Sequence, residues 1–329
     1  MMDLKGKKIL VVGLGKSGLA AALFLRHRGA VVTVSDTRSA AQLATEIPSL
    51  LEEGIIVESG GHGLLTFRRQ DLIVVSPGVP LDTAELVQAR NFGLPIIGEL
   101  ELAARFLKGK TLAITGSNGK TTTTALLGEI LDSAGLPTLV GGNIGIPVVA
   151  LIDKSSDESW AVLEVSSFQL ESTQQFHPKI AVILNITPDH LDRHGSFENY
   201  ARAKERIFAA QNSEDSVVLN ADNPRAASAS TSSKATVYWF SVEHPVSRGA
   251  WLENGYVVYR SAQDAETERV MPLSGIPLKG AHNVENVLAA VVAARLAGVS
   301  AEAIAKSIEN FRAVEHRLEY VATLNGVEF

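Results

Sequence analysis

Two glycine-rich segments constrain the fold more than any other feature of the 329-residue sequence. Gly13–Gly18 follows the short apolar run Lys8–Val12, and Gly116–Thr122 follows the apolar run Thr111–Thr115. Each segment opens a stretch with helical periodicity. A strand, a glycine turn and a helix in this order are typical of parallel sheets with right-handed crossovers. The sequence therefore predicts an α/β fold in which this unit occurs twice.

The first glycine segment indicates a nucleotide site. Glycines permit a tight turn and a close approach of the backbone to phosphate, and the following helix directs its N-terminus at negative charge. Asp36 ends the next predicted strand, Val31–Ser35, and is expected to accept a hydrogen bond from a ribose hydroxyl. A tight strand-to-helix turn without any ligand is the alternative.

The second glycine segment has the character of a phosphate-binding loop. Its backbone amides would hold phosphates, Lys120 would reach the terminal phosphates and the Thr121 hydroxyl would contact Mg²⁺. Ile114 occupies the place of the first glycine of the usual motif. The alternative is a glycine turn with an incidental lysine.

Polar residues follow two further apolar runs. Glu164 comes near the end of Trp160–Val165, where a carboxylate would point into the crevice in which parallel sheets bind ligands. Asn185–His194 follows Ile180–Ile186 and contains two aspartates and two histidines, a density typical of metal or phosphate sites. We expect His190 to be a ligand. A solvent-facing acid is the alternative for Glu164.

Lys204 lies on an unexpected face of a predicted helix, Ser196–Gln211. It is four residues from both Tyr200 and Phe208, which places it on the apolar side. Either its stem covers apolar surface while the amine reaches water, or the amine is buried and its pKa falls far enough for covalent chemistry.

Composition narrows the function classes. Lys and Arg number 30 against 36 Asp and Glu, a net charge of −6, so nucleic acid is not an expected partner. The absence of cysteine excludes a disulfide scaffold and a thiolate zinc site, and fits a cytoplasmic location. No apolar run is long enough to predict a membrane-spanning helix.

A domain boundary is expected near 97–109, and 228–233 is expected to be a small polar loop.

Taken together, the sequence motifs resemble those of the Mur ligase family. The resemblance covers nearly the whole chain, in family order: GLGKSG (13–18), SDTR (35–38), SPGVP (76–80), GELELA (98–103), ITGSNGKTT (114–122), GGNIG (141–145), EVSSFQLE (164–171), NITPDHLDRH (185–194), AHNVEN (281–286) and EHRLE (315–319). It implies a Rossmann-like domain over 1–98, a P-loop-type mononucleotide-binding α/β domain over 99–313, and a hinge over 314–329 toward a third domain that the chain lacks.

The resemblance also implies the site residues. Those expected to hold the UDP-linked substrate are Lys16, Ser17, Asp36, Thr37, Arg38, Gly78, Asn143 and His190. Those expected to hold ATP are Gly116, Ser117, Asn118, Gly119, Lys120, Thr121, Thr122, Asn283, Asn286 and Arg317. Those expected to hold Mg²⁺ are Thr121, Glu164, His190 and Lys204, the last as a carbamate. Lys120, His190 and Lys204 are the expected catalytic residues.

The reaction implied is ATP-dependent amide formation. ATP would phosphorylate the L-alanyl carboxylate of UDP-N-acetylmuramoyl-L-alanine, and the amine of D-glutamate would displace phosphate. We expect a monomer, and we expect the ligation itself to require the third domain. An NAD-dependent oxidoreductase, a nucleotide-binding module without turnover, and a family member that adds another amino acid remain the alternatives.

Overall fold

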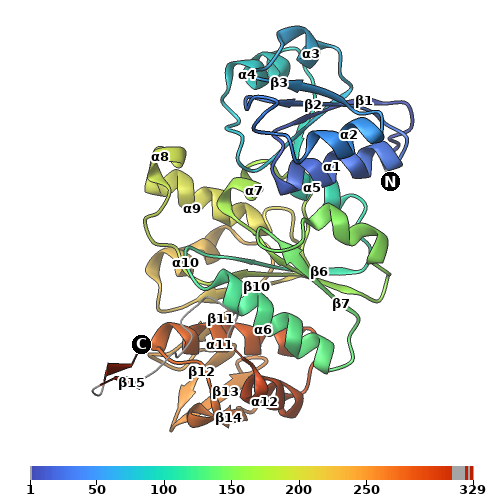
Figure 1. Ribbon diagram of the computed structural model, residues 1–329. Coiled ribbons are helices and arrows are strands. Elements are labelled where there is room, and N and C mark those ends of the chain that lie inside the picture. The colour runs from blue at the N-terminus through green and yellow to red at the C-terminus, as the bar shows by residue number, and fades with distance from the viewer. Residues whose placement is uncertain (1, 313–322, 325–326, 329) are drawn as a thin grey trace.

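The computed structural model describes residues 2–312, 323–324 and 327–328. Figure 1 shows two α/β units stacked along the molecule, with the N-terminal unit above. The first is built on a parallel sheet of order β3-β2-β1-β4-β5. Its strands are β1 (Lys8–Val12), β2 (Val31–Asp36), β3 (Ile56–Ser59), β4 (Leu72–Val75) and β5 (Ile96–Gly98). The strand order reverses beside β1, which is where such sheets bind ligands.

Helices cover both faces of this first sheet (Figure 1). They are α1 (Lys16–His27), α2 (Ile47–Glu52), α3 (Leu64–Arg68), α4 (Ala84–Asn91) and α5 (Glu99–Ala104). Alternate residues of β1 enter different apolar clusters: Ile9 and Val11 pack with α1, whereas Leu10 and Val12 pack with α3 and α4. This division explains why the strand is a continuous apolar run, because both of its faces are buried.

The second unit is built on a sheet of order β14-β13-β12-β11-β10-β9-β6-β8-β7. Its strands are β6 (Lys110–Thr115), β7 (Thr138–Gly142), β8 (Trp160–Glu164), β9 (Ile180–Ile183), β10 (Ser216–Asn220), β11 (Thr236–Ser241), β12 (Gly249–Glu253), β13 (Tyr256–Arg260) and β14 (Glu268–Pro272). Pairing is parallel from β7 across to β12 and antiparallel from β12 to β14. β6 lies between β8 and β9, so the second switch point falls at the phosphate-binding loop.

The remaining helices distribute over this sheet. They are α6 (Lys120–Ser133), α7 (Ser167–Glu171), α8 (Leu191–His194), α9 (Phe197–Glu205), α10 (Pro224–Ser228), α11 (Ala281–Leu296) and α12 (Ala301–Asn310), with the 3₁₀ segments η1 (Val148–Lys154), η2 (Arg206–Phe208), η3 (Ala229–Ser232) and η4 (Leu273–Gly275). α6, α11 and α12 share one apolar cluster on one face. β15 (Thr323–Leu324) and β16 (Val327–Glu328) form a separate antiparallel pair.

The two units share an apolar cluster at their junction. Phe24 of α1 meets Phe106 edge to face at 5.3 Å between ring centroids. Arg28 donates to Asp153 of η1 at 2.6 Å. Glu99 of α5 accepts from the backbone N–H of Val149 at 2.8 Å. The contacts of Arg28 and Glu99 connect the first unit to the segment that follows β7.

Several local expectations were wrong. The spacing of the apolar residues in 282–296 predicts a helix with Val284, Val287, Leu288, Val291 and Val292 on one buried face, whereas α11 is buried on all sides from Val287 to Ala294. β9 ends at Ile183 although the apolar run continues to Ile186, because the chain leaves the sheet there to contact the glycine loop. Residues 228–233 are not an open loop, since α10 and η3 extend through Ser232. The helix expected to reach Gln211 changes to 3₁₀ geometry after Glu205.

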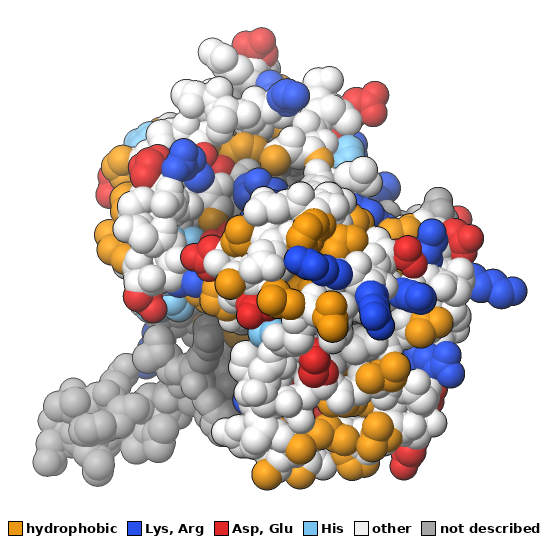
Figure 2. All heavy atoms as spheres, turned by 90° about the horizontal axis from the view of Figure 1, so that it is seen from above, with side chains coloured by type: hydrophobic (Ala, Val, Ile, Leu, Met, Phe, Trp, Pro, Cys, Tyr) orange, Lys and Arg blue, Asp and Glu red, His pale blue; other side chains and the backbone are white. Residues whose placement is uncertain are grey.

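Seen from above, the surface carries acidic, basic and apolar side chains interspersed (Figure 2). Within the described part of the chain, no helix combines the length and apolar character needed to cross a membrane.

Candidate functional site

Two glycines shape the loop between β6 and α6. Gly119 has a φ of 84°, and a Cβ there would lie 2.2 Å from Oδ1 of Asn286. Gly116 has a φ of 159°, and a Cβ there would lie 3.0 Å from Leu184 Cβ. The loop is therefore pressed between the end of β9 and α11. Asn286 donates in turn to Asn283 at 3.1 Å, so both expected ATP-side asparagines lie beside the loop.

Two lysine amines converge on this loop. Lys120 Nζ donates to the carbonyl oxygens of Gly116 and Ser117, each at 2.9 Å. Lys204 Nζ donates to the same Gly116 oxygen at 2.7 Å and lies 4.5 Å from the ring centroid of Tyr200. Lys204 is only 1% exposed. Burial, together with the charge of Lys120, lowers the pKa of Lys204 to about 7. The amine therefore does not reach water.

Two expected site residues contact a third, Glu164, at the end of β8. The Thr121 hydroxyl donates to Glu164 Oε2 at 2.7 Å, and Asn143 Nδ2 donates to Oε1 at 3.1 Å. Glu164 is 2% exposed, so it is not a solvent-facing acid. The carboxylate lies at the carboxyl ends of β6 and β8, where their register pairs Ile114 with Glu164.

The segment after β9 is tied to the glycine loop by its first residues. Asn185 Oδ1 accepts from the backbone N–H of Asn118 at 2.9 Å, and its amide donates back at 3.2 Å. The Ser117 hydroxyl contacts Thr187 and the hydroxyl of Tyr200, each at 3.0 Å. The roles of Asn185 and Tyr200 in holding the loop were not predicted. For Asn185 the available signal was its position directly after a buried strand.

His190 stands further along this segment in a left-handed conformation, with a φ of 49°. Its imidazole is half exposed, 3.5 Å from Asp189 Oδ2 and 5.0 Å from the ring of Phe168. A non-glycine residue in this region is uncommon, and such strain is concentrated at functional sites. His190 therefore presents its ring beside Phe168 rather than within the Thr121–Glu164–Asn143 group.

The first glycine segment forms a second site at the end of β1. Asp36 Oδ2 accepts from the backbone N–H of Leu14 at 2.7 Å, and the Arg38 side chain pairs with the same carboxylate at 3.0 Å. Burial raises the pKa of Asp36, but the hydrogen bonds from Arg38 and Leu14 outweigh it, so the pKa is lowered. A Cβ on Gly18 would lie 1.9 Å from Gly13 O. The glycine is required there.

The other residues expected to hold the substrate surround this end of the sheet. Lys16 begins α1, followed by the half-buried Ser17. Thr37 and Gly78 are exposed, and the carbonyl of Gly78 faces Arg193 at 3.4 Å. Arg317 lies outside the described residues.

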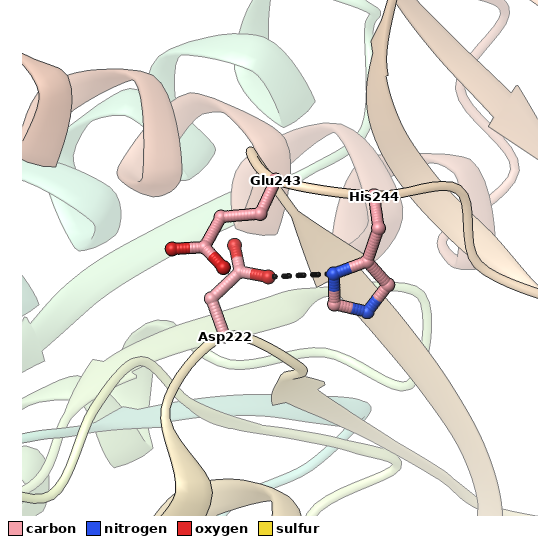
Figure 3. A group of neighbouring side chains, drawn as sticks. All are labelled: Asp222, Glu243 and His244. Atoms are coloured by element: carbon pink, nitrogen blue, oxygen red, sulfur yellow. Dashed lines mark ion pairs between the residues drawn. The ribbon is translucent and has the colours of Figure 1, made fainter.

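A separate cluster joins Asp222, Glu243 and His244 (Figure 3). The carboxylate of Asp222 already accepts from Ser241 Oγ at 2.6 Å and from the Val242 backbone N–H at 2.7 Å, and pairs with His244 at 3.3 Å. These bonds close the turn after β11. The sequence did not predict this cluster. The carboxylate of Asp222 is already engaged by hydrogen bonds within the protein.

The two switch points define a class: an α/β protein with one Rossmann-like domain and one P-loop-type domain. Two family models match. Residues 7–98 match the N-terminal domain described as Mur ligase MurD-like, and residues 114–294 match the Mur ligase middle domain. The chain belongs to the Mur ligase family.

Curated relatives agree with this family assignment. The UDP-N-acetylmuramoylalanine--D-glutamate ligase of Acidobacterium capsulatum is 70% identical over 328 residues, which cover 100% of this chain and 71% of the relative. The enzyme of that name from Koribacter versatilis is 57% identical, covering 100% of this chain and 72% of the relative.

A solved structure agrees with the fold. The UDP-N-acetylmuramate:L-alanyl-gamma-D-glutamyl-meso-diaminopimelate ligase from Neisseria meningitides superposes with a TM-score of 0.63 at 21% identity. The match covers 94% of this chain and 99% of that chain.

Proposed function

We propose that this chain carries the nucleotide and UDP-substrate sites of an ATP-dependent ligase that joins D-glutamate to UDP-N-acetylmuramoyl-L-alanine. The observation that carries the proposal is the convergence of Lys120 and Lys204 on Gly116, beside the Thr121–Glu164–Asn143 group. The names of the relatives at 70% and 57% identity support the substrate.

The residues suit activation of a carboxylate. A carboxylate oxygen attacks the γ-phosphorus of ATP, the bond from that phosphorus to the bridging oxygen breaks, and ADP leaves. The amine of D-glutamate then attacks the acyl phosphate, expelling phosphate and losing a proton. Both reactants of the first step are anions, so a cation at Lys120 lowers the repulsion between them. The narrow loop fixes their approach.

The donors at Glu164 fit Mg²⁺. Thr121 and Glu164 offer a hydroxyl and a carboxylate whose oxygens are 2.7 Å apart, and oxygen is the donor that Mg²⁺ prefers. We propose that both would hold the ion. His190, whose ring lies beside Phe168 outside this group, is the further ligand that the family resemblance implies, and its ring would have to turn toward the ion to bind it. When bound, Mg²⁺ neutralises charge on the phosphates.

We further propose that Lys204 is carbamylated. Its neutral amine would attack CO₂, forming an N–C bond as one C–O π bond opens, and the released proton would pass to solvent. The depressed pKa supports this step, because about half of the amine is neutral at pH 7 and most of it at pH 8. The product is an anion, which would remove the repulsion between Lys204 and Lys120 and would offer oxygens to Mg²⁺.

We propose that the first unit binds the UDP end of the substrate. We propose that Lys16, Ser17 and Arg38 contact the diphosphate or uridine, because α1 begins at Lys16 with its N-terminus at this site. The proposed division of the chain is 1–98 for this unit, 99–313 for the ATP unit and 314–329 for the hinge.

Calorimetry tests the assignment of both sites. UDP-N-acetylmuramoyl-L-alanine and Mg²⁺ with a non-hydrolysable ATP analogue are each expected to bind the chain, whereas NAD⁺ is not. Binding of NAD⁺ without binding of the UDP substrate would favour an oxidoreductase and overturn the proposal.

Mass spectrometry under non-denaturing conditions tests the carbamate. After incubation with bicarbonate and Mg²⁺, a gain of CO₂ is expected in the unaltered chain and not in Lys204→Met. Lys110→Met is the matched control, because Lys110 packs over Trp160 away from the loop. An equal gain of CO₂ in Lys204→Met would contradict the proposal that Lys204 is the carbamylated residue.

A further inference from the structure

A series of polar contacts runs from the first unit to Ser167, which lies three residues after Glu164 in the sequence. It begins at Arg193 of α8, which donates to the carbonyl oxygens of Gly78 at 3.4 Å and Val79 at 3.0 Å. The same guanidinium pairs with Glu171 Oε2 at 3.5 Å and lies over the ring of Phe168. One arginine therefore connects the loop after β4 to the end of α7.

The carboxylate of Glu171 extends this series of contacts through its other oxygen. His194 Nδ1 lies 3.0 Å from Glu171 Oε1, and His194 Nε2 lies 3.0 Å from the hydroxyl of Ser167. Burial is the largest influence on His194 and lowers its pKa. The neutral ring is satisfied at both nitrogens if Nδ1–H donates to Glu171 and Nε2 accepts from Ser167.

The far end of this series of contacts is Ser167. Ser167 is the first residue of α7, three residues after Glu164, and begins the helix directly beyond the strand that carries that carboxylate. His194 likewise ends α8, four residues after His190. The contacts thus connect the two segments that supply the expected Mg²⁺ ligands.

A serine, a histidine and a glutamate at these distances have the arrangement of a hydrolase triad. Ser167 is only 2% exposed, however, so no acyl group can reach its hydroxyl. A role in positioning is consistent with this burial, whereas a role as nucleophile is not.

The surroundings of Glu171 leave room for movement. A cavity of about 440 Å³ opens between the two units here, and its lining includes Leu81, Asp82, Glu171, Arg193, His194 and Arg206. The units meet at this point through polar side chains bordering open space. Such contacts can be made or broken without repacking a core.

We propose that Glu171 is a positioning residue that couples the two ligand sites. A ligand that orders the loop at Gly78 favours the state in which Arg193 is held by Gly78, Val79 and Glu171. That state holds His194 and Ser167, and with them the segments after His190 and Glu164. By linkage, each ligand then raises the affinity for the other. This inference rests on the proposed function, because it takes the UDP substrate and Mg²⁺–nucleotide as the two ligands.

Calorimetric linkage tests the coupling. The affinity for Mg²⁺ with the non-hydrolysable ATP analogue is measured with and without saturating UDP-N-acetylmuramoyl-L-alanine, and the reverse titration checks reciprocity. In the unaltered chain we expect the coupling factor to be at least about fivefold. Glu171→Gln should reduce it below about twofold, because glutamine has no charge to pair with Arg193 and its single oxygen cannot accept from both Arg193 and His194.

Two further variants separate coupling from general damage. Ser167→Ala removes the hydroxyl that contacts His194 at the far end of this series of contacts. It should also lower the coupling factor, while each ligand alone binds within about threefold of the unaltered affinity. Glu198→Gln is the matched control, since it removes an exposed pairing with Arg225 that the chain of contacts does not use.

The outcomes distinguish this inference from the proposed function. Failure of the unaltered chain to bind the UDP substrate would overturn both. Binding of both ligands with no coupling, or coupling that survives Glu171→Gln, would overturn the role of Glu171 and leave the proposed function standing.

Discussion

Lys120 and Lys204 share one acceptor, since both amines donate to the carbonyl oxygen of Gly116, at 2.9 and 2.7 Å. Two like charges at one oxygen repel each other, and Lys204 is the more deeply buried of the two. Burial, and after it the charge of Lys120, lowers the pKa of Lys204 to about 7.

The first prediction follows from that pKa. Between pH 7 and the ordinary value of 10.5, the unfolded chain binds a proton at Lys204 that the folded chain does not. Stability therefore rises with pH in this window, by at most about 1.4 kcal/mol per pH unit. Urea unfolding at pH 7, 8 and 9 should show the free energy of the unaltered chain rising relative to Lys204→Met. A constant difference across these pH values would contradict the burial of a titrating amine.

The second prediction concerns the loop lysine. Lys120→Ala should weaken binding of the Mg²⁺–ATP analogue by about 100-fold, since a cation that contacts phosphate is worth several kcal/mol in a dry site. Isothermal calorimetry measures the loss, and circular dichroism checks the fold. Lys110→Ala should leave the affinity unchanged. Retained affinity in Lys120→Ala would mean that the loop does not hold phosphate.

The third prediction concerns Asp36. Asp36→Asn should destabilise the chain by about 1–3 kcal/mol at pH 7, because a carboxylate that accepts from Leu14 and Arg38 loses its charge and one acceptor. A lowered carboxyl pKa gives stability that is present above the ordinary value of 3.8 and lost as the pH falls. The difference measured by denaturant unfolding should therefore shrink near pH 3. An equal difference at both pH values would argue against an ionised pair.

The fourth prediction concerns Glu99, whose Oε2 is buried without a hydrogen-bond partner. Burial raises the pKa of Glu99 to about 7. A raised carboxyl pKa means that ionisation opposes folding as the pH climbs from 4.5 to 7, by roughly 3 kcal/mol at most. Glu99→Gln should therefore gain stability relative to the unaltered chain between pH 5 and pH 8, as read from thermal melts.

Glu101 provides the contrast for this fourth experiment. Its Oε2 accepts from the backbone N–H groups of Gln174, Gln175 and Phe176, and its Oε1 pairs with Arg105. Glu101→Gln is expected to destabilise the chain at both pH values, because a satisfied charge is removed. Equal changes in stability for Glu99→Gln and Glu101→Gln would contradict this difference between an unsatisfied and a satisfied carboxylate.

The sequence predicted the parts of the fold that depend on local pattern. The two strand–glycine–helix units were visible because glycine geometry and apolar periodicity are local signals, and Lys204 stood out because a charge fell among Tyr200 and Phe208. The α/β class and the family were confirmed. The site roles remain predictions.

What the sequence did not reveal depends on contacts between distant segments. The pairing of β12 with β13 was missed, although Asn254–Gly255 is a strong turn signal, with φ values of 49° and 77°. The contact between Glu171 and Arg193 could not be inferred, because nothing local places the end of α7 beside α8. The burial of α11 on every side likewise depends on which elements surround it.

The contact of Gly119 with Asn286 has a consequence for synthesis on the ribosome. The loop emerges early, but the helix that presses on it is translated roughly 170 residues later, a delay of about 10–30 s at ordinary elongation rates. During that interval the apolar face later covered by α11 has no cover from this chain. That apolar face therefore stays exposed on the nascent chain until residues 281–296 have been made.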